Sequence, residues 1–170
     1  EVFWGVWAEA DYDIGSADPS LSHITKADIG LLPFMFTQQA PILSDILELQ
    51  FQACKLVSMN LTLQFLPLEK HPTLLSDIAN NLAPGGALFL SEKVCFDDNE
   101  RQQRLTDLHH QFKKHQGYSD LEIAQKRSAI ENVLVPQSIE AHQQRLLDAG
   151  FSKVVIALQC LNFAAFIAYK

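Results

Sequence analysis

The sequence has few cysteines and no spacing typical of metal ligands. Its three cysteines, Cys54, Cys95 and Cys160, are scattered through 170 residues. An odd number of widely separated cysteines is not typical of a disulfide framework, nor of a zinc site, whose ligands recur at short fixed intervals. We therefore expect reduced, mostly buried thiols in a cytoplasmic protein, and no metal centre.

Positive charge and long apolar runs are also scarce. The chain has 13 Lys and Arg against 20 Asp and Glu, a net charge of −7. Because nucleic acids are bound through clustered Lys and Arg, this balance argues against direct nucleic-acid binding and against an anionic membrane surface. No apolar run approaches the roughly 18 residues of a membrane span. The chain begins with Glu1 and shows no signal peptide, which is consistent with a fragment or a missing upstream segment.

Two common catalytic signatures are missing. The chain has no P-loop for nucleotide phosphates, and Ser16, Ser44 and Ser91 all lack the Gly-x-Ser-x-Gly context of a nucleophile elbow. The sequence therefore gives no support for a serine hydrolase or a P-loop protein.

The most informative stretch that is present runs from Lys55 to Pro67 and is apolar almost throughout. Such a run predicts a strand that is buried on both faces of an α/β sheet. Its single asparagine, Asn60, falls where that strand should end, and ligands of open parallel sheets bind beyond the carboxyl ends of the strands. Asn60 is thus a candidate site residue, although hydrogen bonding to loop backbone is an equally good explanation.

The second half of the chain predicts a regular alternation of helices and strands. A helix with Leu74, Leu75, Ile78 and Leu82 on one face should precede a turn at 84–86 and a buried strand at 87–91. Three more helices should follow: one carrying Leu105, Leu108 and Phe112, one capped by Ser119 with Glu122, and one capped by Ser138 that ends at Gly150. Two apolar runs, 154–158 and 163–169, then predict a terminal hairpin. The expected class is α/β with an antiparallel edge.

The first fifty residues are less regular. An apolar run at 2–7 suggests a strand, and Asp13-Ile14-Gly15-Ser16 has the acid and glycine with which nucleotide-binding turns begin. Short segments near 27–32 and 41–47 leave little room for crossover helices.

Arg127 is the most informative residue for chemistry. On the helix that begins at Ser119, it recurs with Ile123, Ile130 and Leu134 at spacings of three and four residues, so the guanidinium should lie inside an apolar stripe. A buried cation needs an anion. The partner is either a nearby acid, namely Glu131, Asp120 or Glu122, or the carboxylate of a ligand.

Three other polar residues are weaker candidates. Asp45 could accept a hydrogen bond from a base or sugar, or it could cap its own loop. His109 and His110 lack a partner at metal-ligand spacing, so we interpret them as surface or packing residues.

From Ser44 to Lys170 the chain resembles carboxy-S-adenosyl-L-methionine synthases, enzymes of the class I methyltransferase fold. The resemblance is carried, in one consistent order, by the segments 60–66 (NLTLQFL), 82–86 (LAPGG), 91–93 (SEK), 109–113 (HHQFK), 117–122 (GYSDLE), 125–127 (QKR), 131–133 (ENV) and 159–163 (QCLNF).

The resemblance implies a Rossmann-like, mostly parallel sheet with a C-terminal antiparallel hairpin and a helical insertion at 94–135, all in one domain. It implies conversion of S-adenosyl-L-methionine (SAM) and prephenate to carboxy-SAM and phenylpyruvate, for modification of the tRNA wobble uridine. Asp45 and Ile46 should flank the adenine, Asn60 should lie beside the cofactor, and Arg127 should hold the carboxylate on the sulfonium, across a homodimer.

Residues 1–50 depart from the family pattern. Residues 12–16, with Asp13, Gly15 and Ser16, match the cofactor loop with glycines missing, and Pro19 follows them. The family has an acidic residue that binds the ribose of the cofactor. In this chain the carboxylate near the corresponding position is Asp28. Three functions are therefore compared: an active carboxy-SAM synthase, a non-catalytic relative that dimerises or binds a partner, and a plain SAM-dependent methyltransferase.

Overall fold

A single mixed sheet forms the centre of the protein. The computed structural model describes residues 3–7, 46–49, 51, 53–130 and 133–170. The described strands are β1 (Phe3–Trp7), β2 (Cys54–Asn60), β3 (Leu82–Lys93), β4 (Lys153–Cys160) and β5 (Phe163–Tyr169). Their order across the sheet is β1-β2-β3-β5-β4, and the pairs β1–β2 and β2–β3 are parallel. β5 is antiparallel to both of its neighbours, so the other four strands run in one direction.

β2 ends at Asn60, as the sequence predicts, but it is buried on one face only. Val57 and Met59 are completely or almost completely buried, whereas Lys55 and Leu56 are exposed. The expectation of burial on both faces is therefore wrong. The apolar run also does not continue as strand: after Asn60 the chain turns at Leu61, whose φ is 50°, into a 3₁₀ turn at Leu63–Phe65.

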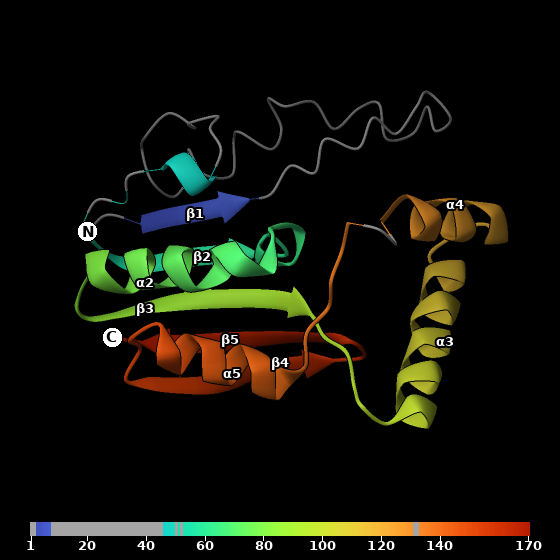
Figure 1. The fold of residues 1–170 in the computed structure, drawn as a ribbon. Helices are drawn as coiled ribbons and strands as arrows, with labels where there is room; N and C mark the ends of the chain where they lie inside the picture. The colour runs from blue at the N-terminus through green and yellow to red at the C-terminus, as the bar shows by residue number, and fades with distance from the viewer. Residues whose placement is uncertain (1–2, 8–45, 50, 52, 131–132) are drawn as a thin grey trace.

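α2 (His71–Asn81) covers the buried face of β2 and β3 (Figure 1). Leu74, Leu75 and Ile78 are buried, which confirms the predicted helix. Leu82, which the spacing places on the same helix, instead begins β3 because its backbone is already extended. Strand β3 is accordingly longer than the predicted 87–91.

The turn expected at 84–86 is instead an irregularity within β3, where the register between β2 and β3 shifts. Gly86 lies where an added Cβ would be 2.8 Å from the carbonyl oxygen of Ala83 and 2.9 Å from that of Lys55. Gly85 has a φ of +72°, which favours glycine. The two glycines therefore serve different purposes: Gly85 permits the irregular backbone, and Gly86 permits the close approach of the backbones.

The C-terminal part follows the prediction closely. α5 (Ile139–Asp148) begins where the Ser138 hydroxyl accepts a hydrogen bond from the backbone N–H of Ala141 at 3.1 Å, and it ends before Gly150, whose φ is +104°. β4 and β5 form the expected antiparallel hairpin. The antiparallel edge is therefore confirmed: β5 is inserted between β3 and β4, and the edge strand β4 pairs with it in antiparallel orientation.

Between β3 and α5 the chain leaves the sheet and returns to it. α3 (Asn99–His115) and α4 (Asp120–Ile130) stand beyond the end of β3 (Figure 1). The predicted capping box of α4 is confirmed, because the Glu122 carboxylate accepts from the Ser119 N–H at 2.7 Å. Val94 and Gln137 form an isolated β-bridge where the chain returns to the sheet, near the boundaries of the helical insertion predicted at 94–135.

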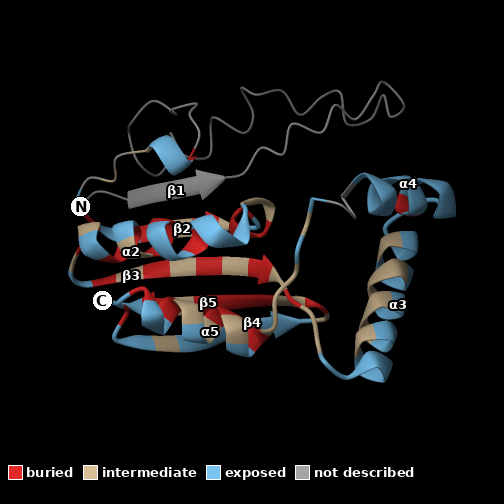
Figure 2. Ribbon diagram, viewed as in Figure 1, coloured by how far each residue is buried: buried red, intermediate tan, exposed pale blue. Residues whose placement is uncertain are grey.

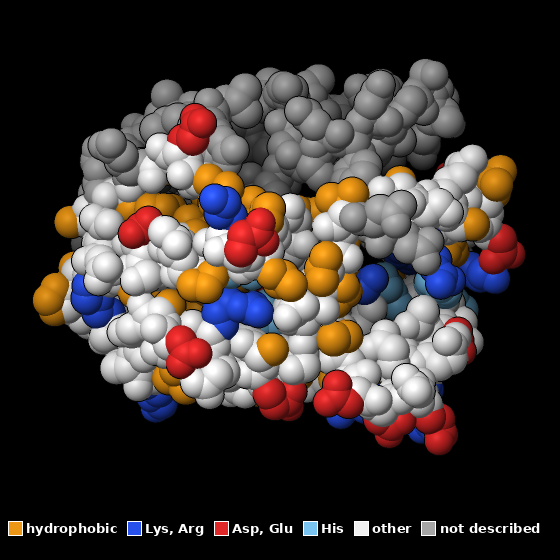
Figure 3. Space-filling view, in the orientation of Figure 1, with side chains coloured by type: hydrophobic (Ala, Val, Ile, Leu, Met, Phe, Trp, Pro, Cys, Tyr) orange, Lys and Arg blue, Asp and Glu red, His pale blue; other side chains and the backbone are white. Residues whose placement is uncertain are grey.

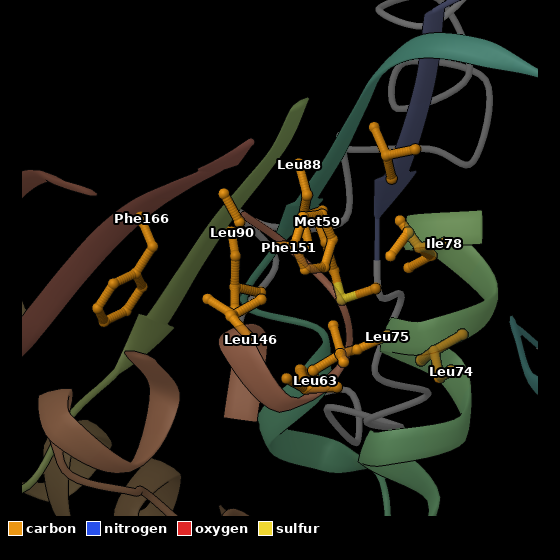
Figure 4. Close-up of a cluster of buried hydrophobic side chains, with 14 of the residues drawn as sticks. Met59, Leu63, Leu74, Leu75, Ile78, Leu88, Leu90, Leu146, Phe151 and Phe166 are labelled. Carbon is orange, nitrogen blue, oxygen red and sulfur yellow. The ribbon is translucent and has the colours of Figure 1, made fainter. Parts of the chain in front are cut away.

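The main core lies between the sheet and the helices α2 and α5 (Figures 2 and 4). Figure 4 shows Met59, Leu75 and Ile78 converging with side chains of β3. Burial is much lower on β4, where Leu158 remains 63% exposed (Figure 2).

Candidate functional site

Asn60 joins the carboxyl ends of the two central parallel strands. Its Oδ1 accepts a hydrogen bond from the Ser91 hydroxyl at 2.7 Å, and its Nδ2 donates to the Ser58 hydroxyl at 3.3 Å. In the sheet register Asn60 is paired with Ser91. The side chain therefore bonds to side chains of the sheet and not to loop backbone, which removes the alternative explanation offered by its position in the sequence. The amide of Asn60 and the hydroxyl of Ser91 thus meet at the carboxyl ends of β2 and β3, where open parallel sheets bind their ligands.

The loop after Asn60 is held to β3 by a buried carboxylate. Glu92 has no exposed surface, and its two carboxylate oxygens accept from the backbone N–H groups of Leu63 and Gln64, each at 3.0 Å. Burial raises the pKa of Glu92 to about 7, although these backbone donors lower it.

The side chain of Gln64 completes the same connection. Its Oε1 accepts from the backbone N–H of Lys93 at 3.0 Å, at the last residue of β3. Glu92 and Gln64 thus fix the loop between β2 and α2 against β3 from both sides. The sequence analysis did not identify Glu92; a single acid directly after the predicted strand 87–91, in the segment 91–93 that carries the resemblance, is the signal that could have found it.

Five basic side chains lie near the end of β3, and we call them the basic cluster: Lys93, His109, His110, Lys113 and Arg127. Burial and then the charge of Arg127 lower the pKa of Lys93. Burial, followed by the charges of Lys113 and Lys93, lowers the pKa of His109 to about 4. Lysine, arginine and histidine side chains gather between the sheet and the helices α3 and α4 (Figure 3).

His109 also makes an aromatic contact. Its ring lies edge-on to that of Phe163, with the centroids 5.3 Å apart. This contact agrees with the packing role expected for His109, but the surrounding charges were not expected. The rule that singled out Asn60 did not reach Lys93, because the predicted strand 87–91 ends two residues before the observed strand does.

Arg127 is exposed, which contradicts its predicted burial in an apolar stripe. In α4 only Ile123 is buried among the residues whose side chains are described, and α4 stands away from the sheet, so there is no core for the stripe to face. The helix ends at Ile130, before the predicted stripe reaches Leu134. Among the described residues Arg127 has no ion-pair partner: Asp120 pairs with Lys114, and Glu122 caps the helix.

The other predicted site residues are mostly beyond the described ranges. Asp13, Gly15, Ser16, Asp28 and Asp45 lie outside the described residues. Ile46 is described; it begins a short 3₁₀ turn, and its side chain is buried in the core cluster.

An open groove of about 700 Å³ lies between α2 and α5, lined among others by Asp77, Arg145 and Asp148. None of the predicted site residues lines it. In the ranges that the structure describes, no three His, Cys, Asp or Glu side chains could together hold a metal ion. None of the described helices is long and apolar enough to cross a membrane.

Comparison with known proteins identifies close relatives by sequence. The chain is 63% identical over 125 residues to a carboxy-S-adenosyl-L-methionine synthase of Stutzerimonas stutzeri, a match that covers 74% of this chain and 51% of the relative. The synthase of Pseudomonas syringae is 57% identical over 137 residues, with 79% and 56% coverage. The chain thus spans about half the length of the curated relatives it matches. No protein-family model matches the chain.

Comparison of structures identifies the fold. An O-methyltransferase of Nostoc punctiforme superposes with a TM-score of 0.51 at 17% identity, over 76% of this chain and 35% of that protein. Human N-acetylserotonin methyltransferase, solved in complex with SAM, gives a TM-score of 0.52 at 17% identity, over 76% and 33%. The chain therefore has the Rossmann-like fold of SAM-dependent methyltransferases, and its sequence is similar to that of carboxy-S-adenosyl-L-methionine synthases over about half of their length.

Proposed function

We propose that the protein converts SAM and prephenate to carboxy-SAM and phenylpyruvate. The observation that carries this proposal is the 63% identity to a carboxy-SAM synthase over 74% of the chain. The described half of the site supports it, because polar and cationic groups meet at the carboxyl ends of β2 and β3, where methyltransferase folds of this type bind ligands.

The proposed reaction balances without a further co-reactant. Prephenate loses CO₂ and hydroxide as its ring becomes aromatic, and it leaves as phenylpyruvate. The methyl carbon on the positively charged sulfur of SAM loses one proton, which the hydroxide takes up to form water. That carbon then bonds to the carbon of CO₂, which becomes the carboxylate of the product.

The described residues suit these ligands. Asn60 and Ser91 offer an amide and a hydroxyl at the strand ends, and they hold one another in place. Both the prephenate substrate and the carboxylated product are carboxylates, for which Arg127 and Lys93 are suitable partners. Because Arg127 is exposed on α4, it is free to reach a ligand held by a second copy of the chain.

A second function deserves a test because of one specific observation. Residues 12–16 match the cofactor loop of the family with glycines missing, and Pro19 follows them. A non-catalytic relative that dimerises or binds a partner protein is consistent with that altered loop. A plain methyltransferase is less well supported, because it would have no use for a carboxylate-binding Arg127.

The test begins with purified protein whose folding is confirmed by circular dichroism. Calorimetric titration with SAM and with carboxy-SAM measures binding, and incubation with SAM and prephenate is followed by mass spectrometry for carboxy-SAM. The active synthase should bind the carboxylated form selectively and form product. A folded protein that binds neither ligand and forms no product would instead favour the non-catalytic relative.

Several finer expectations stay predictions of the resemblance. They are the supply of carboxy-SAM for tRNA wobble-uridine modification, a homodimer, a cytoplasmic location, and cofactor contacts by Asp13, Gly15, Ser16, Asp28, Asp45 and Ile46.

A further inference from the structure

The groove between α2 and α5 lies beside buried nitrogen atoms that find no hydrogen-bond partner among the described residues. They are Nδ1 of His71, Nδ1 of His142 and Nη1 of Arg145. His71 and His142 are 1% and 3% exposed, and Arg145 lines the groove itself. Because a buried polar group without a partner is costly, this arrangement points to a ligand that supplies the missing hydrogen bonds.

The three side chains act on one another electrostatically, which places them together where α2 and α5 meet. After burial, the charge of Arg145 lowers the pKa of His142, and the charge of His71 lowers it further. Burial also lowers the pKa of His71, and Arg145 contributes again. Figure 3 shows a blue basic side chain in the seam between α2 and α5, with pale-blue histidine atoms beside it.

The positive charge of Arg145 has no counter-ion in the part of the chain that the structure describes. Its Nη2 donates to the neutral amide oxygen of Gln137 at 3.3 Å, and the ion pairs between described residues do not include it. Burial lowers the pKa of Arg145, and no described carboxylate opposes that shift. A half-buried guanidinium of this kind suits an anionic ligand.

The acidic side chains nearby are engaged elsewhere or act only weakly. Asp148 lines the groove, but it accepts a hydrogen bond from Gln144 at 2.8 Å. Asp77 also lines the groove and is exposed to solvent on α2. Glu69 acts on His71, but its effect is the smallest of those on that ring. These acids therefore leave room for one anion beside Arg145.

The histidines indicate which kind of anion fits. Nε2 of His71 bonds to the carbonyl oxygen of Leu66 at 3.0 Å, so Nε2 carries the ring hydrogen and Nδ1 of the neutral ring can only accept. A phosphate group has unprotonated oxygens that accept from Arg145 and a hydroxyl that donates to an imidazole. The same bond forms if the imidazole carries the proton instead. Carboxylates and sulfate have no such hydrogen near neutral pH.

From this arrangement we propose that the groove between α2 and α5 binds a phosphate monoester, with Arg145, His71 and His142 as the partners of the phosphate group. The groove volume of about 700 Å³ leaves room for the organic part of such a ligand. The hydroxyl groups of Thr73 and Ser76 line its α2 wall and offer further hydrogen bonds. The polar groups at the carboxyl ends of β2 and β3 do not line the groove, so the proposal does not depend on the proposed function.

The two buried histidines are the reporters for this site. Their ring proton signals are assigned from the variants His71→Gln and His142→Gln, and they are followed by NMR across the pH range. The spectra are recorded in a buffer free of phosphate and then with ribose 5-phosphate. A bound phosphate group should make protonation of His142 at least about tenfold more favourable, because its negative charge opposes that of Arg145.

Two other histidines serve as internal controls. His115 is exposed on α3, and His109 belongs to the basic cluster. A shift of the His142 titration without a shift of His115 supports the site. An unchanged His142 titration at about 10 mM ligand, which would nearly saturate a site with a Kd of about 1 mM, overturns the proposal. A shift of His109 alone also overturns it, since the ligand would then bind at the basic cluster.

Two aspartates provide a matched pair of variants. Asp148 on α5 and Asp107 on α3 each accept from a glutamine one turn earlier at 2.8 Å, but only Asp148 lines the groove. Asp148→Asn should strengthen ribose 5-phosphate binding, measured from the His142 signal, at least about twofold, because it removes a negative charge beside the phosphate. Asp107→Asn should leave the affinity unchanged. Equal gains in both variants would mean that only net charge is sensed, which overturns the site.

Arg145→Gln should weaken binding at least about tenfold, and Arg104→Gln, which removes an exposed arginine of α3, should leave binding unchanged. Unchanged affinity in a folded Arg145→Gln variant overturns the proposal. Because Arg145 also bonds to Gln137, its folding is checked by circular dichroism, and the aspartate pair decides if the variant does not fold.

Three ligands separate the possible anions. At about pH 7 sulfate should bind at least about fivefold more weakly than inorganic phosphate, because it has no hydrogen to donate to an imidazole. Equal affinities overturn the assignment of the histidines. Tighter binding of ribose 5-phosphate than of inorganic phosphate supports the monoester, and the reverse order overturns it in favour of the free phosphate ion.

Discussion

Glu92 is a carboxylic acid with no exposed surface, and its ionisation state couples pH to the loop that follows Asn60. Its pKa of about 7 in the folded protein lies above the ordinary value of 4.5. The unfolded chain therefore releases this proton first as pH rises. The stability that Glu92 contributes is fully present below about pH 4.5 and is lost by about pH 7, by about 3 kcal/mol.

Glu92→Gln tests this coupling, because glutamine does not titrate. At about pH 5 the variant should be less stable than the wild type by about 1–3 kcal/mol, since its amide NH₂ faces a backbone N–H of Leu63 or Gln64. Between about pH 5 and pH 8 the wild type should lose about 3 kcal/mol of its free energy of unfolding, and the variant should not. Urea unfolding at both pH values measures it. A difference between Glu92→Gln and the wild type that stays constant from about pH 5 to about pH 8 contradicts the raised pKa.

Arg127 is the residue whose proposed role depends most on the ligand. Arg127→Ala should weaken binding of carboxy-SAM by about tenfold or more and change SAM binding far less, because only the carboxylated form offers the extra charged contact. Calorimetry measures both affinities. Arg104→Ala is the control, since that exposed arginine pairs with Glu100 on α3. Equal losses of affinity for the two ligands would show that Arg127 does not bind the carboxylate.

At the scale of single elements, α5 shows how a local signal in the sequence determines a helix boundary. The Ser138 hydroxyl accepts from the Ala141 N–H, so Ser138→Ala should lower the free energy of unfolding by about 1 kcal/mol. Chemical denaturation provides the measurement. Ser128→Ala is the matched control, because Ser128 is exposed inside α4, where alanine is at least as favourable. An equal loss of unfolding free energy in Ser128→Ala would contradict the explanation by helix capping.

The contact between β2 and β3 requires glycine at position 86, and this requirement arises from packing between two strands. A Cβ on residue 86 would meet two backbone oxygens within 2.9 Å, and backbone cannot move aside as a flexible side chain can. Gly86→Ala should therefore destabilise the protein by about 2 kcal/mol or more. Gly85→Ala, where the space is open but φ is +72°, should cost about 1 kcal/mol. Thermal unfolding of both variants compares them, and the reverse order would contradict the packing argument.

At the scale of the whole molecule, the packing of α5 on the sheet makes the fold sensitive to acid. His142 is 3% exposed beside Phe166, and burial, then the charges of Arg145 and His71, lower its pKa to about 4. The unfolded chain takes up a proton near the ordinary value of 6.5. The stability that His142 contributes is therefore present above about pH 6.5 and is lost as pH falls towards 4, by about 3 kcal/mol.

His142→Gln should reduce this acid sensitivity. Between about pH 7 and pH 4 the variant should lose about 3 kcal/mol less stability than the wild type, because glutamine takes up no proton. Denaturant unfolding at the two pH values gives the difference. Parallel curves for His142→Gln and the wild type would refute the prediction.

The sequence by itself determined the features that depend on neighbouring residues. The helical spacing of Leu74, Leu75 and Ile78, the caps at Ser119 and Ser138, and the strand end at Asn60 all lie where local pattern predicts them. Each of these follows from backbone hydrogen bonding or from the period of one element, so no knowledge of distant residues is needed. The resemblance to carboxy-SAM synthases was likewise carried by short segments in order, and sequence comparison confirms it.

Only the tertiary structure decided the features that depend on contacts between different helices and strands. The spacing around Arg127 looks like a buried stripe, but α4 stands away from the sheet, so the arginine is exposed. The burial of Glu92 and the gathering of Lys93 with His109 and Lys113 join residues of different elements, and no periodicity within one element encodes such contacts. The insertion of β5 between β3 and β4 has the same cause, because pairing between distant strands is chosen by the whole sheet and not by the hairpin alone.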